Sequence, residues 1–255
     1  MEAILECSNV CAGYGRINVL DHFSLSLAPG KVLGVIGPNG SGKTTLINAL
    51  SGLIIPTEGA IHFNGKNITK LSPDTRCRLG IARTFQVPHP FERMTVFENI
   101  LTAAAFGSGG QKQQIWETAE NALCFARLQD RRNTLSGELM LLDRKRLEIA
   151  RAVSTRPRLI LLDEIAAGLT SMELSEILEM VAGLKAGGYS IIWIEHIIEM
   201  MLNATDELIC MAEGKNVVSG LPAEVLRSEQ VEQLYLGRQE GPDVRRDRED
   251  TDAAN

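Results

Sequence analysis

The sequence predicts an α/β protein with a mainly parallel core sheet, an antiparallel β subdomain and an inserted helical subdomain. Three observations lead to this fold class. Short apolar runs alternate with helical stretches, which indicates βαβ units and a parallel sheet. Alternating apolar and polar residues near the start of the chain indicate antiparallel strands. A long helical stretch interrupts the strands in the middle of the chain, which indicates an insertion.

Size and composition limit the possible classes of protein. The chain has 255 residues, of which 44% are hydrophobic, so it can bury one substantial core. Its net charge of -6 and the lack of a basic patch argue against a nucleic-acid partner. We find no basic-then-apolar leader and no apolar stretch approaching about 18 residues, the length of a membrane span. We therefore expect a protein that is soluble by itself.

The cysteines do not follow a metal-binding pattern in the sequence. Cys7 and Cys11 lie close together, but they have no second pair and no histidine at a zinc-binding spacing. We expect reduced, partly buried thiols in a cytosolic protein rather than a metal site. The five cysteines are Cys7, Cys11, Cys77, Cys124 and Cys210.

The first part of the chain predicts an antiparallel sheet. Residues 3–11 and 22–27 alternate apolar and polar side chains, and residues 59–65 form another short hairpin strand. Between the first two strands, Gly13-Tyr14-Gly15 presents an aromatic side chain in a flexible turn. Tyr14 is predicted to stack on an adenine base, and an ordinary hairpin tyrosine is the alternative.

A phosphate-binding loop is predicted directly after the apolar run at residues 32–36. The pattern is G-x-x-x-x-G-K-[ST], in which glycines bring backbone N–H groups close to an anion. The helix expected from about residue 43 to residue 50 points its positive end at the same place. The predicted nucleotide-binding residues are Gly37, Pro38, Asn39, Gly40, Ser41, Gly42, Lys43, Thr44 and Thr45.

Three side chains of this loop have predicted roles toward a polyphosphate. Lys43 would neutralise the β- and γ-phosphates, and the Thr44 hydroxyl would ligate Mg²⁺. Thr45 would place its hydroxyl near the α-phosphate. An ordinary glycine-rich turn is the alternative.

The middle of the chain changes from strands to helices. Residues 81–86 are predicted to form a buried strand that ends at Gln86, and the prolines that follow break regular structure. A helical pattern then predicts an insertion over about 87–157. Gln86 would stand at the hinge, where it could contact Mg²⁺ or the attacking water and report the nucleotide state to the helices.

Acidic residues and a histidine follow two later strands. The apolar run 159–162 leads into Asp163 and Glu164, and the run 191–194 leads toward His196. Asp163 is predicted to bind Mg²⁺ through water, and Glu164 to polarise the water that attacks the γ-phosphate. His196 is predicted to donate to the γ-phosphate.

Crossover helices explain why these strand ends should meet. Helices expected at about 171–186 and 197–203 give parallel connections, so the carboxyl ends of the strands converge on one crevice near the phosphate loop. A further strand at 206–211 and short helices at about 222–236 complete the domain. Residues 238–255 are highly charged and are predicted to be a disordered tail.

These elements, in this order, resemble the ATP-binding cassette (ABC) ATPases over residues 3–237. Several stretches are similar to the branched-chain amino acid importer ATPases in particular. The resemblance implies an ABC-type P-loop ATPase domain over residues 1–237 that binds ATP and Mg²⁺ and hydrolyses ATP. The stretches that carry the closer resemblance are 79–86, 91–99, 146–152, 166–169 and 234–237.

The resemblance also implies partners and a location. The family pattern is a peripheral subunit on the cytoplasmic side of the cell membrane, in which two ATPase subunits sandwich two ATP molecules. Two membrane permeases, fed by a solute-binding protein, would carry the solute. The implied function is therefore to couple ATP hydrolysis to uptake of branched-chain amino acids or related small solutes.

Two stretches depart from the family pattern. The signature Leu-Ser-Gly-Gly-Gln is expected at 139–143, where Met140 and Leu142 supply neither the hydroxyl nor the glycine N–H that hold the partner subunit's ATP. The nearest textual match, at 135–138, lies four residues too early. The turn at 169–171 lacks the usual Asp or Asn. We therefore expect a heterodimer with a second ATPase that carries a regular signature.

Three other functions remain open. A soluble ABC protein acting on ribosomes or DNA usually has two cassettes or a long coiled-coil insertion. A regulatory module that binds ATP without hydrolysing it would fit the altered signature, although Glu164 and His196 count against it. A P-loop kinase outside the family would have no use for Gln86 and His196 in this order.

Overall fold

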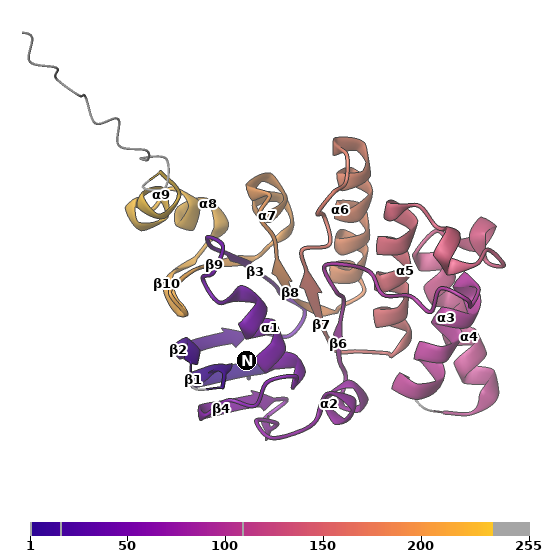
Figure 1. The fold of residues 1–255 in the computed structure, drawn as a ribbon, viewed down its shortest axis with the longest axis horizontal. Coiled ribbons are helices and arrows are strands. Elements are labelled where there is room, and N and C mark those ends of the chain that lie inside the picture. The colour runs from indigo at the N-terminus through magenta and orange to yellow at the C-terminus, as the bar shows by residue number, and fades with distance from the viewer. Residues whose placement is uncertain (1, 16, 109, 237–255) are drawn as a thin grey trace, which may run out of the picture.

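The computed structural model describes residues 2–15, 17–108 and 110–236, and it has two sheets and a set of surrounding helices (Figure 1). The predicted tail at 238–255 lies outside the described residues, as does Gly237. In the part of the chain that is described, no helix is both long enough and apolar enough to cross a membrane.

The N-terminal part forms the predicted antiparallel sheet, with strand order β2-β1-β4-β5. The first two strands are longer than the sequence pattern indicated, because bulges in the pairing of β1 with β2 interrupt the alternation of side chains. Together they form one long hairpin that ends at Tyr14. The strands are β1 (Leu5–Tyr14), β2 (Ile17–Leu27), β4 (Glu58–Phe63) and β5 (Lys66–Asn67).

The central sheet has the order β10-β9-β3-β8-β7-β6. Its strands pair in parallel from β9 to β6, as predicted, and β10 alone is antiparallel to its neighbour β9. The strands are β3 (Val32–Ile36), β6 (Ile81–Arg83), β7 (Leu159–Asp163), β8 (Ser190–Ile194), β9 (Glu207–Ala212) and β10 (Lys215–Gly220).

Helices cover the central sheet and extend beyond one end of it. Helices α3, α4 and α5 follow β6 in the chain and lie together at one end of the molecule (Figure 1). The helices are α1 (Lys43–Ser51), α2 (Pro73–Leu79), α3 (Val96–Ala103), α4 (Lys112–Phe125), α5 (Leu141–Ser154), α6 (Ser171–Ala186), α7 (Ile198–Ala204), α8 (Pro222–Leu226) and α9 (Glu229–Leu236). A π-helical turn at Ala104–Ser108 directly follows α3. Short 3₁₀ turns lie at Gln129–Arg131 and Ser136–Glu138.

The strands β3, β7 and β8 are buried on both faces of the central sheet, which is why they read as continuous apolar runs. On one face, side chains such as Ile160 and Trp193 share a core with α3 to α9. On the other face, side chains such as Leu161 and Ile192 pack with α1 and the antiparallel sheet. The helices at 96–154 therefore share a continuous core with the sheet.

One strand is shorter than predicted. The sequence predicts a strand over 81–86, but β6 ends at Arg83. The amide of Thr84 still donates to Leu161 O at 2.9 Å, and Phe85 is half-exposed, so the chain leaves the sheet before Gln86. The Gln86 side chain then contacts Glu164 instead of the core.

A buried arginine forms hydrogen bonds to the C-terminal end of α1, the helix that follows the phosphate loop. Arg76 is fully buried and donates to the carbonyls of Ala49 and Leu50, in the last turn of α1, at 2.6 and 2.8 Å. Two further donor groups bond the carbonyls of Thr69 and Leu71. Burial lowers the pKa of Arg76 to about 10, so it stays charged at neutral pH. It satisfies carbonyl groups that the end of a helix leaves unpaired.

We expect Arg76→Met to lower the free energy of unfolding by roughly 3 kcal/mol or more, because several buried carbonyls would lose a charged donor. Urea denaturation followed by circular dichroism measures the change. The matched control is Arg78→Met in the same helix, where an exposed arginine pairs with Asp74 and the loss should stay below about 1 kcal/mol. Equal stability of the two variants would contradict the role of Arg76.

Candidate functional site

The phosphate loop connects β3 to α1 in the predicted strand–loop–helix arrangement. Gly40 and Gly42 have φ angles of 81° and 103°, which glycine adopts without strain. Gly42 is the N-cap residue of α1, so the unpaired N–H groups of the first turn face the loop. Loop and helix therefore form an anion-binding concavity.

The side chains of the loop are arranged for a charged ligand. Lys43 is buried, and its amine donates to the carbonyls of Gly37 and Pro38 at 2.8 and 3.1 Å. The Ser41 hydroxyl is buried and bonds no other group among the described residues. Thr44 is exposed and Thr45 is buried. A polyphosphate would supply the missing hydrogen-bond partner of the Ser41 hydroxyl and would fit inside the glycine-rich loop.

Gln86, Glu164 and His196 meet at the ends of β6, β7 and β8, as the sequence predicts. The Gln86 amide donates to Glu164 Oε2 at 2.5 Å, and His196 Nε2 lies 2.7 Å from Glu164 Oε1. The Glu164 amide donates to Ile194 O at 2.9 Å, which fixes the backbone against β8. The three side chains thus form one hydrogen-bonded group centred on a carboxylate.

The backbone of Glu164 is in the left-handed region, with φ of 45°. A residue with a side chain rarely adopts this conformation, and it is typical of functional positions. It directs the Glu164 carboxylate toward Gln86 and His196. The strain is thus local to the residue with the predicted catalytic role.

Asp163 is buried and forms an ion pair with Arg83, whose Nη2 donates to Oδ2 at 3.0 Å. Burial raises the pKa of Asp163, and the hydrogen bond and charge of Arg83 act in the opposite direction. Arg83 is not among the site residues that the sequence predicts. The available signal was a single basic residue at the end of an apolar strand.

Arg83 also connects this carboxylate to the predicted adenine contact. Its Nη1 donates to Asn48 Oδ1 at 2.7 Å, and Asn48 Nδ2 donates to the Tyr14 hydroxyl at 2.9 Å. Tyr14 is exposed at the end of the β1–β2 hairpin. A chain of hydrogen bonds therefore links Tyr14, Asn48, Arg83 and Asp163 across α1.

Two buried charged residues near the strand ends were also missed. Lys145 of α5 donates to the backbone carbonyls of Gln86 and Glu164 at 2.5 and 3.4 Å. Glu195 accepts from the Ala166 amide at 2.7 Å. Burial lowers the pKa of Lys145 and raises the pKa of Glu195. Only the helical spacing could have indicated that Lys145 faces inward.

The two unusual stretches have structural explanations in this chain. Met140 is the N-cap residue of α5 and is 79% exposed, so an apolar side chain stands where the family signature has serine. Ser136, in the textual match, is fully buried and donates to Phe91 O at 2.8 Å, so its hydroxyl is not available to a ligand. Thr170 caps α6 in a reciprocal pair of bonds with Glu173.

The donor groups present fit a nucleotide with a divalent cation. Lys43 and the amides at the start of α1 suit phosphate oxygens, and hydroxyl and carboxylate oxygens such as those of Thr44 and Asp163 are the ligands that Mg²⁺ prefers. Glu164, flanked by Gln86 and His196, is the nearby carboxylate that could orient a water. The arrangement can thus bind a polyphosphate and activate water beside it.

Comparisons with known proteins agree with this geometry. The family model described as "ABC transporter" matches residues 20–167. A probable branched-chain amino acid transport ATP-binding protein, LivG, of Archaeoglobus fulgidus is 35% identical over 253 residues, with 93% of this chain and 96% of the relative covered. The lipopolysaccharide export system ATP-binding protein LptB of Haemophilus influenzae is 31% identical, with 93% and 98% covered.

The fold also matches solved structures. A nucleotide-free ATP-binding cassette from an ABC transporter superposes with a TM-score of 0.84 at 33% identity, covering 91% of this chain and 98% of the other. The predicted fold class and the prediction of an ATPase are therefore confirmed. The roles of individual site residues stay predictions.

We expect Glu164→Gln to keep ATP binding and to lower the rate of hydrolysis by roughly 10²–10⁴-fold, because the amide cannot accept a proton from water. Phosphate release measures turnover, and a fluorescent nucleotide measures binding. The control is Glu179→Gln, which removes an exposed carboxylate that pairs with Arg127. Turnover of the Glu164 variant near that of the parent chain would remove Glu164 from its predicted role.

Proposed function

Because the chain belongs to the ABC transporter family, we propose that it is the ATP-hydrolysing subunit of an importer for branched-chain amino acids or related small solutes. The observation that carries the proposal is the hydrogen-bonded group of Gln86, Glu164 and His196 beside the phosphate loop. The assignment of solute is supported by the relatives named for branched-chain amino acid transport.

The proposed mechanism assigns each step to a residue of this chain. Lys43 and the loop amides would hold the phosphates, and Thr44 and Asp163 would hold Mg²⁺. The cation, when bound, neutralises charge on the β- and γ-phosphate oxygens. Glu164 orients the attacking water, and His196 donates to the γ-phosphate.

Gln86 is proposed to relay the state of the nucleotide to the helices. Its amide touches Glu164, and its backbone carbonyl accepts from Lys145 of α5. A change at Glu164 therefore reaches the helical segment through two direct contacts. In this proposal residues 1–237 form one ATPase domain, and the helices within about 87–157 are the part that responds to nucleotide.

The proposed import function is tested in the host organism, where the gene for this chain is replaced by one that encodes the Glu164→Gln variant. We expect uptake of radiolabelled leucine, isoleucine and valine to be lost, while uptake of an unrelated sugar is unchanged. Glu179→Gln provides the matched control. Normal amino acid uptake, with loss of lipopolysaccharide from the outer membrane, would instead favour the export function for which LptB is named.

A second ATPase is proposed as partner because of the region at 139–143. In a dimer that sandwiches ATP, the N-terminus of α5 would face the partner's nucleotide. The exposed Met140 and the half-exposed Leu141 present apolar surface there instead of hydroxyl and glycine N–H groups. The nucleotide held by this chain's own loop would be completed by the partner's regular signature.

We expect the mixed complex with a second ATPase to hydrolyse ATP faster than the chain alone, because one of its two sites is complete. The double variant Met140→Ser/Leu142→Gly should raise the turnover of the chain alone by restoring the missing groups. Leu135→Ser, at a neighbouring exposed leucine, should leave it unchanged. Equal turnover of the chain alone and the mixed complex would end the proposal of a heterodimer.

A membrane permease is proposed to dock in a hollow of about 230 Å³ between α2, β6 and α5. Its rim includes two exposed apolar side chains, Leu53 and Phe85. Phe85 directly precedes Gln86, so a segment seated there would lie next to the proposed relay. We propose that this segment comes from the cytoplasmic face of the permease, which places the chain at that side of the membrane.

We expect Leu53→Glu to reduce co-purification with the permease several-fold without changing ATP binding, because a charge would replace apolar contact. Pull-down from solubilised host membranes and a nucleotide-binding assay measure the two properties. The control is Leu221→Glu, at an exposed leucine beside α8. Loss of ATP binding in the Leu53 variant, or equal recovery of permease with both variants, would contradict docking at this hollow.

A further inference from the structure

Three neighbouring strands of the antiparallel sheet bring a thiol, an imidazole and a carboxylate together. Cys11 on β1 pairs with Glu58 on β4, and His22 lies on β2 on the other side of β1. One ligand atom from each of the three residues lies within 4.8 Å of the others. The residues are 11 and 36 positions apart in the chain, so linear spacing could not have indicated this cluster.

A bulge places the imidazole over the thiol. The pairing of β1 with β2 shifts between Val10 and Ala12, which leaves Cys11 opposite the irregular position on β2. His22 has φ of 50° there, and its amide donates to Cys11 Sγ at 3.3 Å. Its Nδ1 lies 3.7 Å from that sulfur, and its Nε2 lies 3.9 Å from Glu58 Oε2.

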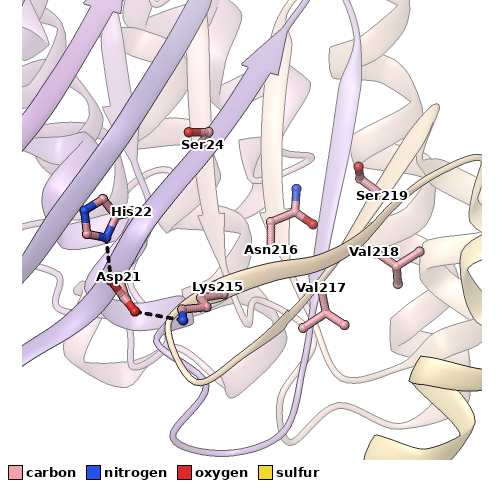
Figure 2. A pocket seen from close by; sticks show the side chains of 8 residues that line it. All are labelled: Asp21, His22, Ser24, Lys215, Asn216, Val217, Val218 and Ser219. Carbon is pink, nitrogen blue, oxygen red and sulfur yellow. Dashed lines mark hydrogen bonds and ion pairs between the residues drawn. The ribbon is translucent and has the colours of Figure 1, made fainter.

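The cluster combines a buried donor with accessible ones. Cys11 is 2% exposed, whereas the side chains of His22 and Glu58 are 64% and 66% exposed. His22 also lines a cleft of about 480 Å³ between β2 and β10. Figure 2 shows Asp21 between the His22 ring and Lys215, with its carboxylate 2.6 Å from Nδ1 and 2.9 Å from the amine.

We propose that Cys11, His22 and Glu58 bind a divalent transition metal ion of the zinc class. Ligand atoms around tetrahedral zinc lie about 3.3–3.6 Å apart, given bonds of about 2.0–2.3 Å. The sulfur-to-nitrogen distance of 3.7 Å is already close to that value. An ion that takes Nδ1 would displace the hydrogen bond from His22 to Asp21, and the exposed Glu58 side chain, which now lies beside Nε2, would turn toward the ion.

The chemistry of the donors distinguishes this ion from the Mg²⁺ that accompanies ATP. Thiolate and imidazole favour zinc and similar metals, whereas Mg²⁺ requires oxygen ligands. The arrangement does not suit a cysteine nucleophile. Such a site places the thiol and the orienting carboxylate on different imidazole nitrogens. Here Cys11 and Asp21 both approach Nδ1.

An ion bound there would hold three strands together near the nucleotide site. Cys11 lies three residues before Tyr14 on the same strand. Next to His22, the amide of Asp21 donates to Gly214 O, and the Gly214 amide donates to Ser41 O of the phosphate loop. The ion would therefore stabilise the hairpin that carries Tyr14, and metal should raise the thermal unfolding temperature.

The test is a titration of Co²⁺ into the reduced, nucleotide-free full chain in excess Mg²⁺, followed by displacement with Zn²⁺. We expect one equivalent to bind, with a thiolate-to-cobalt charge-transfer band and a rise in unfolding temperature. Cys11→Ser should abolish the band. His22→Asn should weaken binding by more than the roughly 10–100-fold that loss of a ligand's hydrogen-bond partner costs.

The variants are chosen to separate binding from folding. Asparagine tolerates the positive φ at residue 22, so His22→Asn preserves the bulge and decides the question even if Cys11→Ser folds poorly. Cys124→Ser and His62→Asn are controls at a second thiol and a second imidazole, and both should bind like the parent chain. No saturable binding, a band that survives Cys11→Ser, or a band lost in Cys124→Ser would overturn the proposal. None of these outcomes depends on ATP hydrolysis.

Discussion

The pairing of Asp163 with Ile194 across β7 and β8 determines the spacing of the whole site. Neighbouring strands lie about 4.8 Å apart, so residues that follow the ends of paired parallel strands are held side by side. Glu164 and His196 are brought into contact in this way, and β6 adds Gln86 from the other side of β7. The group of Gln86, Glu164 and His196 therefore depends on a register that the buried apolar faces of these strands enforce.

Buried cations balance the carboxylates that this convergence brings together. Arg83 pairs with Asp163, and Lys145 lies close to several acidic side chains at the strand ends. Without such partners, burial would favour the neutral form of these acids. Because Lys145 belongs to α5, the same balance of charge ties the helical segment to the strand ends.

Much of the architecture could be predicted because apolar periodicity and turn residues are local signals. The strand before the phosphate loop, the helix expected at about 171–186 and the meeting of Gln86, Glu164 and His196 all appear as expected. The contacts that could not be predicted join residues far apart in the chain. Arg76 and Arg83 form hydrogen bonds to residues 27 and 80 positions away. The residues beside them in the sequence do not indicate these partners.

Irregular backbone was the other source of error. The bulges in β1 interrupt the alternation of apolar and polar residues, so the strand continues beyond the alternating segment. Strand β6 ends earlier than predicted because the chain turns outward at Phe85. Ser136 belongs to the textual match that lies four residues before the expected signature position, and its hydroxyl is used inside the protein.

The left-handed backbone at Glu164 sets the proposed catalytic role of this residue against thermodynamic stability. Glycine would relieve the strain at this position, and an L-residue pays roughly 1–2 kcal/mol to remain there. A library of this protein selected only for heat resistance or expression should therefore lose the carboxylate early and accumulate well-folded but inert chains. Laboratory evolution of this scaffold thus requires a simultaneous screen for turnover.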